Sequence, residues 1–171
     1  MDDFISLACG DATEWKGDGV GLVFTNPYAA IPAQLHNLPM IISLHHPAGK
    51  LRHERITKAE DWCGGPLMHL SDWGKRNAIY VRNLPWKLLT IRELEVDTTD
   101  APPNVGWFPL ELCVMMLNEY RDAIPEGARV WDGFCGRATV GKACHKLGIG
   151  YVGIDIDPER IALARKYLEL A

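Results

Sequence analysis

The sequence predicts a doubly wound α/β fold built on a mostly parallel sheet. Seven short apolar runs bounded by turn residues indicate strands, and five longer stretches between them indicate helices. Strands that alternate with helices need crossover connections, which place helices on both faces of a parallel sheet. A chain of 171 residues that is 47% hydrophobic and 23% charged can bury one core of this kind, so we expect a single domain.

The predicted elements follow one another in a regular order. The expected strands are 4–8, 20–25, 39–44, 77–81, 88–96, 128–132 and 149–155. The expected helices are 29–37, 50–62, 109–123, 139–147 and 158–170. Residues 98–106 contain two prolines and a glycine, which disfavour regular structure, so we expect a loop inside the domain there.

The composition argues against several classes of protein. No apolar run approaches the roughly 20 residues of a membrane-spanning helix, and the first residues are acidic, unlike an export signal. The five cysteines form no CxxC pair, and His36, His45, His46 and His53 lack the spacing of zinc ligands, so we expect neither disulfides nor a metal. These features together predict a soluble, cytoplasmic protein with no membrane partner.

Charge is segregated along the chain, although the formal net charge is only −4. Residues 1–44 carry one basic and five acidic residues, 45–92 carry nine and four, and 93–171 carry eight and thirteen. A basic middle between acidic ends is typical of a face that meets phosphates, but an ordinary solvated helix face gives the same count. The candidate phosphate contacts are Lys50, Arg52, Arg55 and Lys58, which follow a predicted strand.

Ligands of doubly wound sheets bind beyond the carboxyl ends of the strands, so the residues that follow each strand matter most. After the strand ending at Asp132 comes a glycine-bearing turn that opens a helix, and Gly133 and Gly136 allow the backbone to approach a ligand there. Asp155 ends the next strand, where its carboxylate can accept hydrogen bonds from a ribose diol. A nucleoside-containing cofactor fits this unit, and so does a plain structural strand–helix turn. Cys135, inside the turn, is expected to fill space rather than act as a nucleophile.

A second strand end carries Asn26, Pro27 and Tyr28. The asparagine offers a carbonyl acceptor, the proline fixes the chain direction, and the tyrosine offers a flat ring that can stack on a planar substrate. The three together suit an aromatic amine. The alternative is an Asn-Pro turn with a tyrosine that packs into the core.

In this order, these segments resemble the amino-directed DNA methyltransferases, which transfer a methyl group from S-adenosylmethionine to the exocyclic amine of adenine or cytosine. The family's cofactor signature is similar to D-P-F-x-G-S-G-T, and residues 132–139 read DGFCGRAT. Upstream, FPLE at 108–111 resembles the start of the family's K-P-hydrophobic-E helix, with Phe108 in place of the lysine. Residues 151–168 and 5–15 resemble its ribose-binding and adenine-side strands.

The resemblance implies a seven-stranded, Rossmann-like methyltransferase fold in the circularly permuted arrangement. The catalytic half, 1–97, comes first, the cofactor half, 98–171, comes last, and no separate target-recognition domain is expected. The cofactor residues it implies are Asp11, Phe108, Pro109, Asp132, Phe134, Gly136, Thr139 and Asp155. The resemblance covers roughly half of the chain, and 45–100 matches by strand pattern only.

In the mechanism that the resemblance implies, Asn26 and the carbonyl of Pro27 accept the two amine hydrogens while Tyr28 stacks on the base. The family turn usually has four residues, so either the second proline is missing or Thr25 takes the first place and Asn26 replaces a proline. A base inside a duplex cannot reach such a pocket, so it must be flipped out or be single-stranded. The four basic residues 50, 52, 55 and 58 would then hold phosphates beside it.

Two other functions stay open at this stage. One is a catalytically inactive relative that binds cofactor or DNA as a subunit, with a protein partner or a second copy supplying recognition. The other is a methyltransferase that acts on RNA or on a protein amide, because a turn of this kind serves any planar amine.

Overall fold

The computed structural model describes residues 4–45, 52–73, 77–87 and 109–169. The strands are β1 (Ile5–Cys9), β2 (Val20–Thr25), β3 (Met40–His45), β4 (Met68–Trp73), β5 (Asn77–Arg82), β6 (Arg129–Asp132) and β7 (Gly150–Asp155). The α-helices are α1 (Arg52–Cys63), α2 (Leu110–Glu119), α3 (Thr139–Leu147) and α4 (Pro158–Tyr167), with short 3₁₀ turns η1 (Ala12–Glu14), η2 (Ala33–Leu35) and η3 (Arg121–Ala123).

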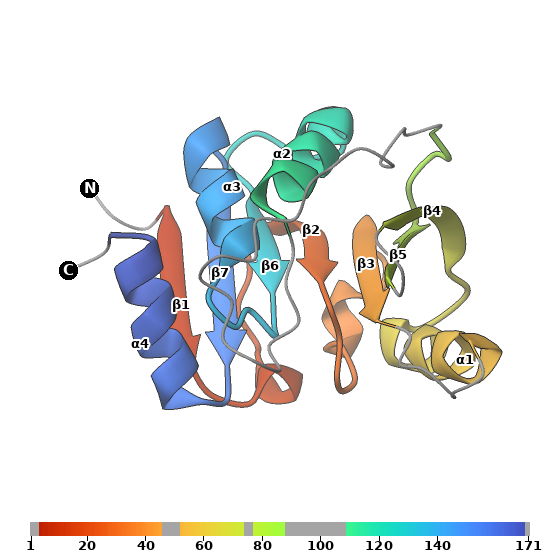
Figure 1. The fold of residues 1–171 in the computed structure, drawn as a ribbon, viewed down its shortest axis with the longest axis horizontal. Coiled ribbons are helices and arrows are strands. Elements are labelled where there is room, and N and C mark those ends of the chain that lie inside the picture. Colours follow the sequence, from red (N-terminus) through yellow and green to blue (C-terminus); the bar gives the residue numbers. More distant parts are fainter. Residues whose placement is uncertain (1–3, 46–51, 74–76, 88–108, 170–171) are drawn as a thin grey trace.

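The strands form one sheet in the order β1-β7-β6-β2-β3-β5-β4 (Figure 1). Strands β1, β7, β6, β2 and β3 pair in parallel, so their carboxyl ends lie at the same edge of the sheet. Strand β5 pairs antiparallel with both β3 and β4. The predicted doubly wound, mostly parallel sheet of seven strands is confirmed.

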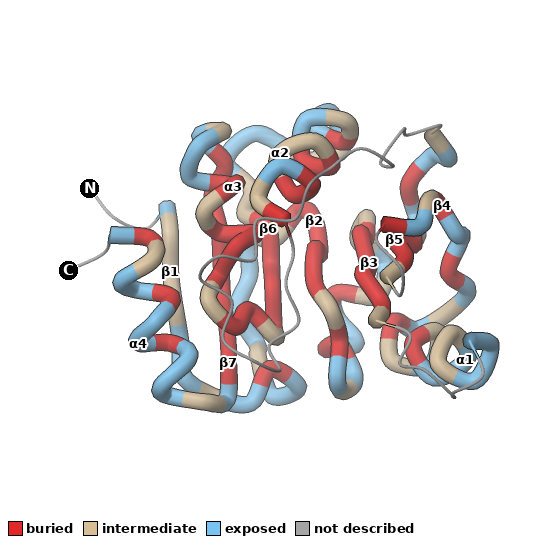
Figure 2. The backbone as a smooth tube through the Cα atoms, in the orientation of Figure 1, coloured by how far each residue is buried: buried red, intermediate tan, exposed pale blue. Residues whose placement is uncertain are grey.

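Two hydrophobic layers cover the sheet, and the inner strands β7, β6, β2, β3 and β5 are almost entirely buried, whereas the edge strands β1 and β4 are partly exposed (Figure 2). One layer joins α2, α3 and α4 to side chains such as Phe24 and Val130. The other joins α1, η1 and η2 to side chains such as Val23 and Trp131. Because neighbouring residues of a strand point to opposite faces, Val23 and Phe24 belong to different layers.

The expected helix at 29–37 was wrong, because only the short turn η2 forms there. Pro32 precedes that turn, and a residue before a proline is disfavoured in the helical conformation. Ile31 is instead held by a hydrogen bond from its N–H to the carbonyl of Trp62, at 2.9 Å.

Strand β4 was not expected from the sequence. It is the edge strand next to β5, and His69, Ser71 and Asp72 interrupt its apolar residues, so the segment MHLSDW lacks the continuous apolar run of the central strands. The expected strand at 88–96 and the expected loop at 98–106 lie outside the described residues. The other expected strands and helices are present, with ends shifted by a few residues. Within the part of the chain that the structure describes, no helix is long and apolar enough to cross a bilayer.

Candidate active site

The sheet divides at β2 and β6, which are neighbours that lead to opposite faces. The chain leaves β2 toward η2 in one layer and leaves β6 toward α3 in the other. A parallel sheet opens a crevice at such a switch point, just beyond the carboxyl ends of the two strands. The candidate site is therefore the edge where residues 26–28 and 133–139 begin.

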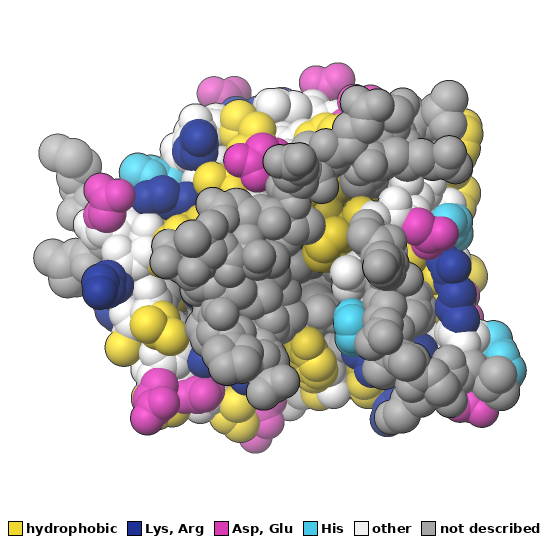
Figure 3. Space-filling view, viewed as in Figure 1, with side chains coloured by type: hydrophobic (Ala, Val, Ile, Leu, Met, Phe, Trp, Pro, Cys, Tyr) yellow, Lys and Arg dark blue, Asp and Glu magenta, His cyan; other side chains and the backbone are white. Residues whose placement is uncertain are grey.

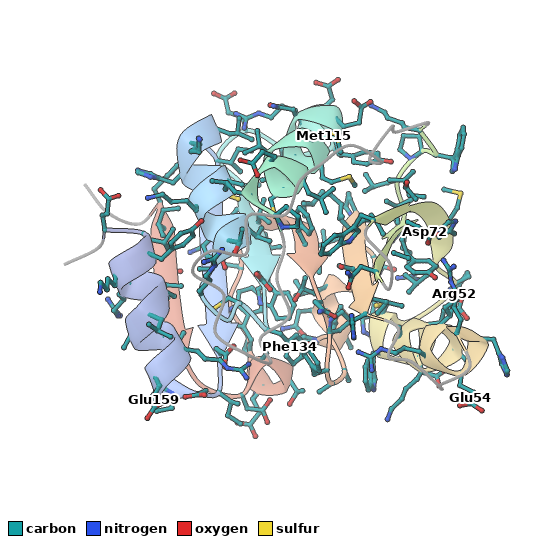
Figure 4. All side chains as sticks on the ribbon, viewed as in Figure 1. Arg52, Glu54, Asp72, Met115, Phe134 and Glu159 are labelled. Carbon is teal, nitrogen blue, oxygen red and sulfur yellow. The ribbon has the colours of Figure 1, made fainter. Side chains whose placement is uncertain are left out.

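The two turns face each other across this edge. Beyond the last paired residues, Val23 and Trp131, the Thr25 hydroxyl donates a buried hydrogen bond of 2.7 Å to Asp132 Oδ1. Further out, the rings of Tyr28 and Phe134 meet edge to face, with centroids 6.1 Å apart. Figure 4 labels Phe134 at this edge. These segments, far apart along the chain, therefore share one rim of the sheet.

The turn after β2 presents a buried acceptor that no described residue satisfies. Asn26 Oδ1 is buried, and no donor in the described parts of the chain hydrogen-bonds to it. Its amide nitrogen donates to the Tyr28 hydroxyl over 3.4 Å, and Tyr28 itself is 52% exposed while Pro27 is buried. A buried acceptor without a donor costs about 1–3 kcal/mol, so this arrangement favours a ligand that supplies the missing hydrogen.

The turn after β6, residues 133–138, has its backbone held from several sides. The Cys135 N–H donates to the Ile154 carbonyl at 2.9 Å, and the Gly136 N–H donates to Asp155 Oδ2 at 2.9 Å. Gly136 has a φ of +53°, and no described atom lies within 4 Å of where its Cβ would be. The described residues accordingly leave space beside the backbone at Gly136.

Two other residues of this turn are fixed by packing. A Cβ on Gly133 would lie 2.1 Å from the Trp131 ring and 2.9 Å from Ala12, so only glycine fits. Ala138 adopts the left-handed conformation with φ +63°, directly before α3. Burial raises the pKa of the Cys135 thiol above its ordinary value, which agrees with a packing role.

Asp132 occupies the buried centre of the site. Its carboxyl accepts from Thr25, from the Phe134 N–H at 3.4 Å and from the Tyr151 hydroxyl at 3.4 Å. Burial is the largest influence on this group and raises its pKa from the ordinary 3.8 to about 7, although the hydrogen bonds oppose the shift.

The carboxyl ends of β1 and β7 form one side of the crevice. The Gly10 N–H donates to the Asp155 carbonyl at 3.0 Å, which brings the segment with Asp11 beside β7. Asp11 Oδ1 accepts from the Thr13 hydroxyl and N–H, and these bonds lower the pKa of Asp11. Asp155 is buried, and its other oxygen accepts from the Asp157 N–H at 3.0 Å.

Ile156 is an exposed apolar residue beside the crevice that the sequence analysis did not single out. It follows Asp155 directly and is 73% exposed, the largest exposure among the large hydrophobic side chains of the described residues. An exposed apolar side chain beside polar groups marks a place where a flat apolar ligand can lie. The signal in the sequence is a single isoleucine between two aspartates at the end of a buried strand.

The remaining predicted cofactor residues lie at helix starts. Pro109 is buried and precedes α2, whereas Phe108 lies outside the described residues. Thr139 is buried at the first position of α3, and its hydroxyl is 3.4 Å from Arg137 Nε. The Arg137 guanidinium lies 4.8 Å from the centre of the Tyr167 ring of α4, so its bulk is directed toward that helix.

The predicted phosphate contacts have different surroundings. Lys50 lies outside the described residues, and Arg52 binds Asp72 at 2.8 Å and the Tyr80 hydroxyl at 3.2 Å (Figure 4). Arg55 is half-buried, with no hydrogen-bond partner for its Nε among the described residues, and Lys58 lies 5.1 Å from the Trp62 ring. Basic, acidic and histidine side chains are intermingled around α1 and β4 (Figure 3). The structure therefore shows a mixed surface at α1.

Comparisons with known proteins show the fold. No family model matches the chain. The solved structure of the M1.HpyAVI complex with SAM aligns with 95% of this chain and 98% of its own, with a TM-score of 0.59 and 17% identity. The PvuII DNA methyltransferase, specific for cytosine N4, aligns with 98% of this chain and 86% of its own, with a TM-score of 0.62 and 12% identity. The chain therefore has the Rossmann-like methyltransferase fold.

One curated protein is similar in sequence. The ribosomal protein L11 methyltransferase of Caldanaerobacter subterraneus subsp. tengcongensis is 31% identical over 114 residues. The match covers 65% of this chain and 36% of the relative, so the chain matches about a third of that protein's length.

Proposed function

We propose that the protein is an S-adenosylmethionine-dependent methyltransferase that acts on the exocyclic amino group of adenine or cytosine in DNA. One observation carries this proposal: Asn26 Oδ1 is buried and has no hydrogen-bond donor among the described residues, in a turn that faces the glycine turn across the switch point. The fold supports a methyl transfer, and the unpaired acceptor supports an amine as the receiving group.

The residues around the crevice fit the cofactor. Gly136 leaves room for a ligand against the backbone, Asp155 and Asp11 carry carboxylates, and Ile156 offers an exposed apolar surface. We assign the ribose to Asp155 and the adenine to Asp11 and Ile156, with Pro109, Asp132, Phe134 and Thr139 shaping the methionine end. When bound, S-adenosylmethionine supplies an electrophilic methyl group on a sulfonium sulfur.

The chain's own residues would prepare the amine for attack. The exocyclic nitrogen of a nucleobase is a poor nucleophile because its lone pair is delocalised into the ring. Asn26 Oδ1 and the Pro27 carbonyl accept its two hydrogens, which localises the lone pair, and Tyr28 stacks on the base. Holding the amine in line contributes up to about 7–11 kcal/mol in well-oriented reactions.

The side-chain contacts favour one of the two registers of the turn. The Thr25 hydroxyl is fully buried and donates to Asp132, so it already has a role inside the sheet. Asn26 Oδ1, in contrast, has no donor within the described ranges. We therefore assign the amine contact to Asn26, with Tyr28 two residues later instead of three.

DNA is the substrate that fits the remaining features best. Helix α1 follows the carboxyl end of β3, and Arg55 and Lys58 lie on it, so phosphates beside a flipped base could reach them. Within this proposal the catalytic half, 1–97, precedes the cofactor half, 98–171, as in the circularly permuted arrangement. A protein partner or a second copy would supply target recognition.

A protein substrate is the second candidate. The observation that favours it is the 31% identity to an enzyme whose name gives a ribosomal protein as its substrate. A backbone or side-chain amide is also planar and also presents hydrogens to Asn26 Oδ1.

The test is methyl incorporation from labelled S-adenosylmethionine into unmethylated DNA, RNA and ribosomal protein offered side by side. We expect label in DNA, and a loss of about 100-fold to 1,000-fold in Asn26→Ala, the range seen when one positioned hydrogen-bonding group is removed from a catalytic site. Asn118→Ala, an exposed asparagine on α2, is the matched control and should keep full activity. Label in protein or RNA alone would overturn the choice of substrate.

Cofactor binding separates an enzyme from an inactive relative. S-adenosylmethionine should raise the melting temperature, because a ligand that binds only the folded state stabilises it. Stabilisation without incorporation into any of the three substrates would identify a binding module. A melting temperature unchanged at millimolar cofactor would exclude both.

A further inference from the structure

The strands that carry the two halves of the candidate site are joined by a side-chain hydrogen bond just beyond the point where their backbone pairing stops. The parallel ladder between β2 and β6 ends at the pair Val23 and Trp131. Thr25, two residues further along β2, donates its hydroxyl to Asp132 Oδ1 at 2.7 Å. Thr25 is fully buried and Asp132 is only 3% exposed, so water does not compete for this bond.

Asp132 is also held from the other side. Its second oxygen accepts from the Tyr151 hydroxyl of β7 at 3.4 Å, and its first accepts from the Phe134 N–H in the cofactor turn. The Tyr151 ring has room to reach it because Gly141 of α3 and Gly153 of β7 carry no Cβ, which would lie 2.6 Å and 2.7 Å from the ring. The carboxyl of Asp132 thereby links β2, β7 and the turn 133–138.

We propose that Thr25 is a positioning residue whose bond to Asp132 sets the separation between the catalytic turn, 26–28, and the cofactor turn, 133–138. Asn26 follows Thr25 directly and Gly133 follows Asp132 directly, so a change in this bond moves the first residue of each turn. The catalytic consequence rests on the proposed function, but the link between the turns does not.

Such a link matters because methyl transfer depends on separation. Reacting atoms must approach to roughly 3–3.5 Å, and a displacement of about 1 Å can cost on the order of 100-fold in rate. Threonine suits this role because its branched Cβ restricts χ1, which holds the hydroxyl in one direction. The edge contact between Tyr28 and Phe134 lies further from the sheet, where Tyr28 is half exposed. The buried link between the two strand ends is therefore the bond from Thr25 to Asp132.

The experiment compares Thr25→Val, which keeps the shape and removes the hydroxyl, with Thr25→Ser, which keeps the hydroxyl. Amide hydrogen exchange is followed at Asn26 and Tyr28 and at residues 133–136, together with kcat, KM and the Kd for S-adenosylmethionine. In Thr25→Val we expect exchange to rise about 10-fold in both turns together. We expect kcat to fall about 10-fold to 100-fold while the cofactor Kd changes less than about threefold. Thr25→Ser should keep the exchange rates, kcat and the cofactor Kd close to those of the wild type.

The control is Ser43→Ala, which removes another buried hydroxyl from the neighbouring strand β3. It should lower the melting temperature without raising exchange in either turn. Unchanged exchange in Thr25→Val, or an equal rise of exchange in both turns in Ser43→Ala, would overturn the proposal. Should Thr25→Val not fold, Thr25→Cys supplies a weaker donor and an intermediate effect. A wild-type protein that methylates nothing would refute the proposed function, whereas the exchange data would still decide the link.

Discussion

The two turns at the switch point differ in how their polar groups are hydrogen-bonded. In the turn 133–138, backbone N–H groups find acceptors within the fold, as Cys135 does at Ile154 and Gly136 does at Asp155. In the turn 26–28, Asn26 keeps a buried oxygen to which no residue in the described part of the chain donates, and Tyr28 exposes half of its surface. The backbone of one turn is thus held by hydrogen bonds, and the other turn carries an acceptor that the described residues leave unsatisfied.

This difference implies that substitutions should separate stability from activity. Substitutions in the turn 133–138 should reduce stability and cofactor binding together, because packing determines the shape of this turn. Substitutions of the polar side chains in the turn 26–28 should remove activity at little cost in stability, because these side chains make few contacts in the free protein.

Gly133→Ala should have the largest effect. The added Cβ would meet the Trp131 ring and Ala12, and overpacking of this kind costs about 1–3 kcal/mol. For a chain of this size, each kcal/mol lowers Tm by about 2–4 °C, which thermal unfolding followed by circular dichroism will measure. Gly10→Ala is the control, because no atom lies within 4 Å of its Cβ position, and it should leave Tm nearly unchanged.

Tyr28→Ala should reduce methylation and leave Tm within about 1 °C. Stacking of one base on an aromatic ring is worth about 1–3 kcal/mol, so kcat/KM for DNA should fall by about 5-fold to 150-fold. Tyr28→Phe keeps the ring and should lose much less. Equal losses in both variants would mean that the hydroxyl, not the ring, is what the site uses.

Asp132→Asn should remove the part of the pH dependence of the free energy of unfolding that comes from the titration of Asp132. The pKa of Asp132 is raised in the folded protein to about 7, so between about pH 4 and pH 7 the folded state keeps a proton that the unfolded state has lost. The wild type should therefore lose stability relative to the variant as the pH rises through this window, by at most about 1.4 kcal/mol per pH unit. Urea unfolding at four pH values tests this, and a constant difference between the two proteins would contradict it.

The smallest effects are expected on α1. Lys58→Ala and Arg55→Ala should each reduce the slope of log K against log salt for DNA binding by about 0.9, the contribution of one phosphate contact. Arg52→Ala should change the slope less, because Arg52 already pairs with Asp72. Lys146→Ala, at the far end of α3, removes the same charge away from the edge and should not alter the slope.

Much of this arrangement was predictable from local sequence. The apolar runs that form β2, β6 and β7 are continuous and end in polar residues, which is why the strand ends carrying Asn26 and Asp155 were found. Strand β4 was missed because polar side chains interrupt its apolar residues, as is common in an edge strand.

The helix at 29–37 was wrongly expected because the segment is mostly apolar, and the restriction that Pro32 places on the preceding residue was not taken into account.

Other features depend on contacts that no local pattern reveals. The choice between Thr25 and Asn26 as the amine acceptor needed the side-chain partners, since both residues can accept hydrogen bonds. The basic residues of α1 looked equivalent in the sequence, but Arg52 alone among the three described bonds an acidic residue there. Asp132 was expected at the cofactor, while its bonds to Thr25 and Tyr151 come from strands far apart along the chain.

The bond between Thr25 and Asp132 joins residues 107 positions apart. Synthesis on the ribosome proceeds from the amino terminus, so the segment with Asn26 is made long before its partner strand exists. A nascent chain that has not yet released β6 has no crevice and no means to align a substrate. Under the proposed function, the crevice that would align a substrate therefore forms only after β6 has been made and has paired with β2.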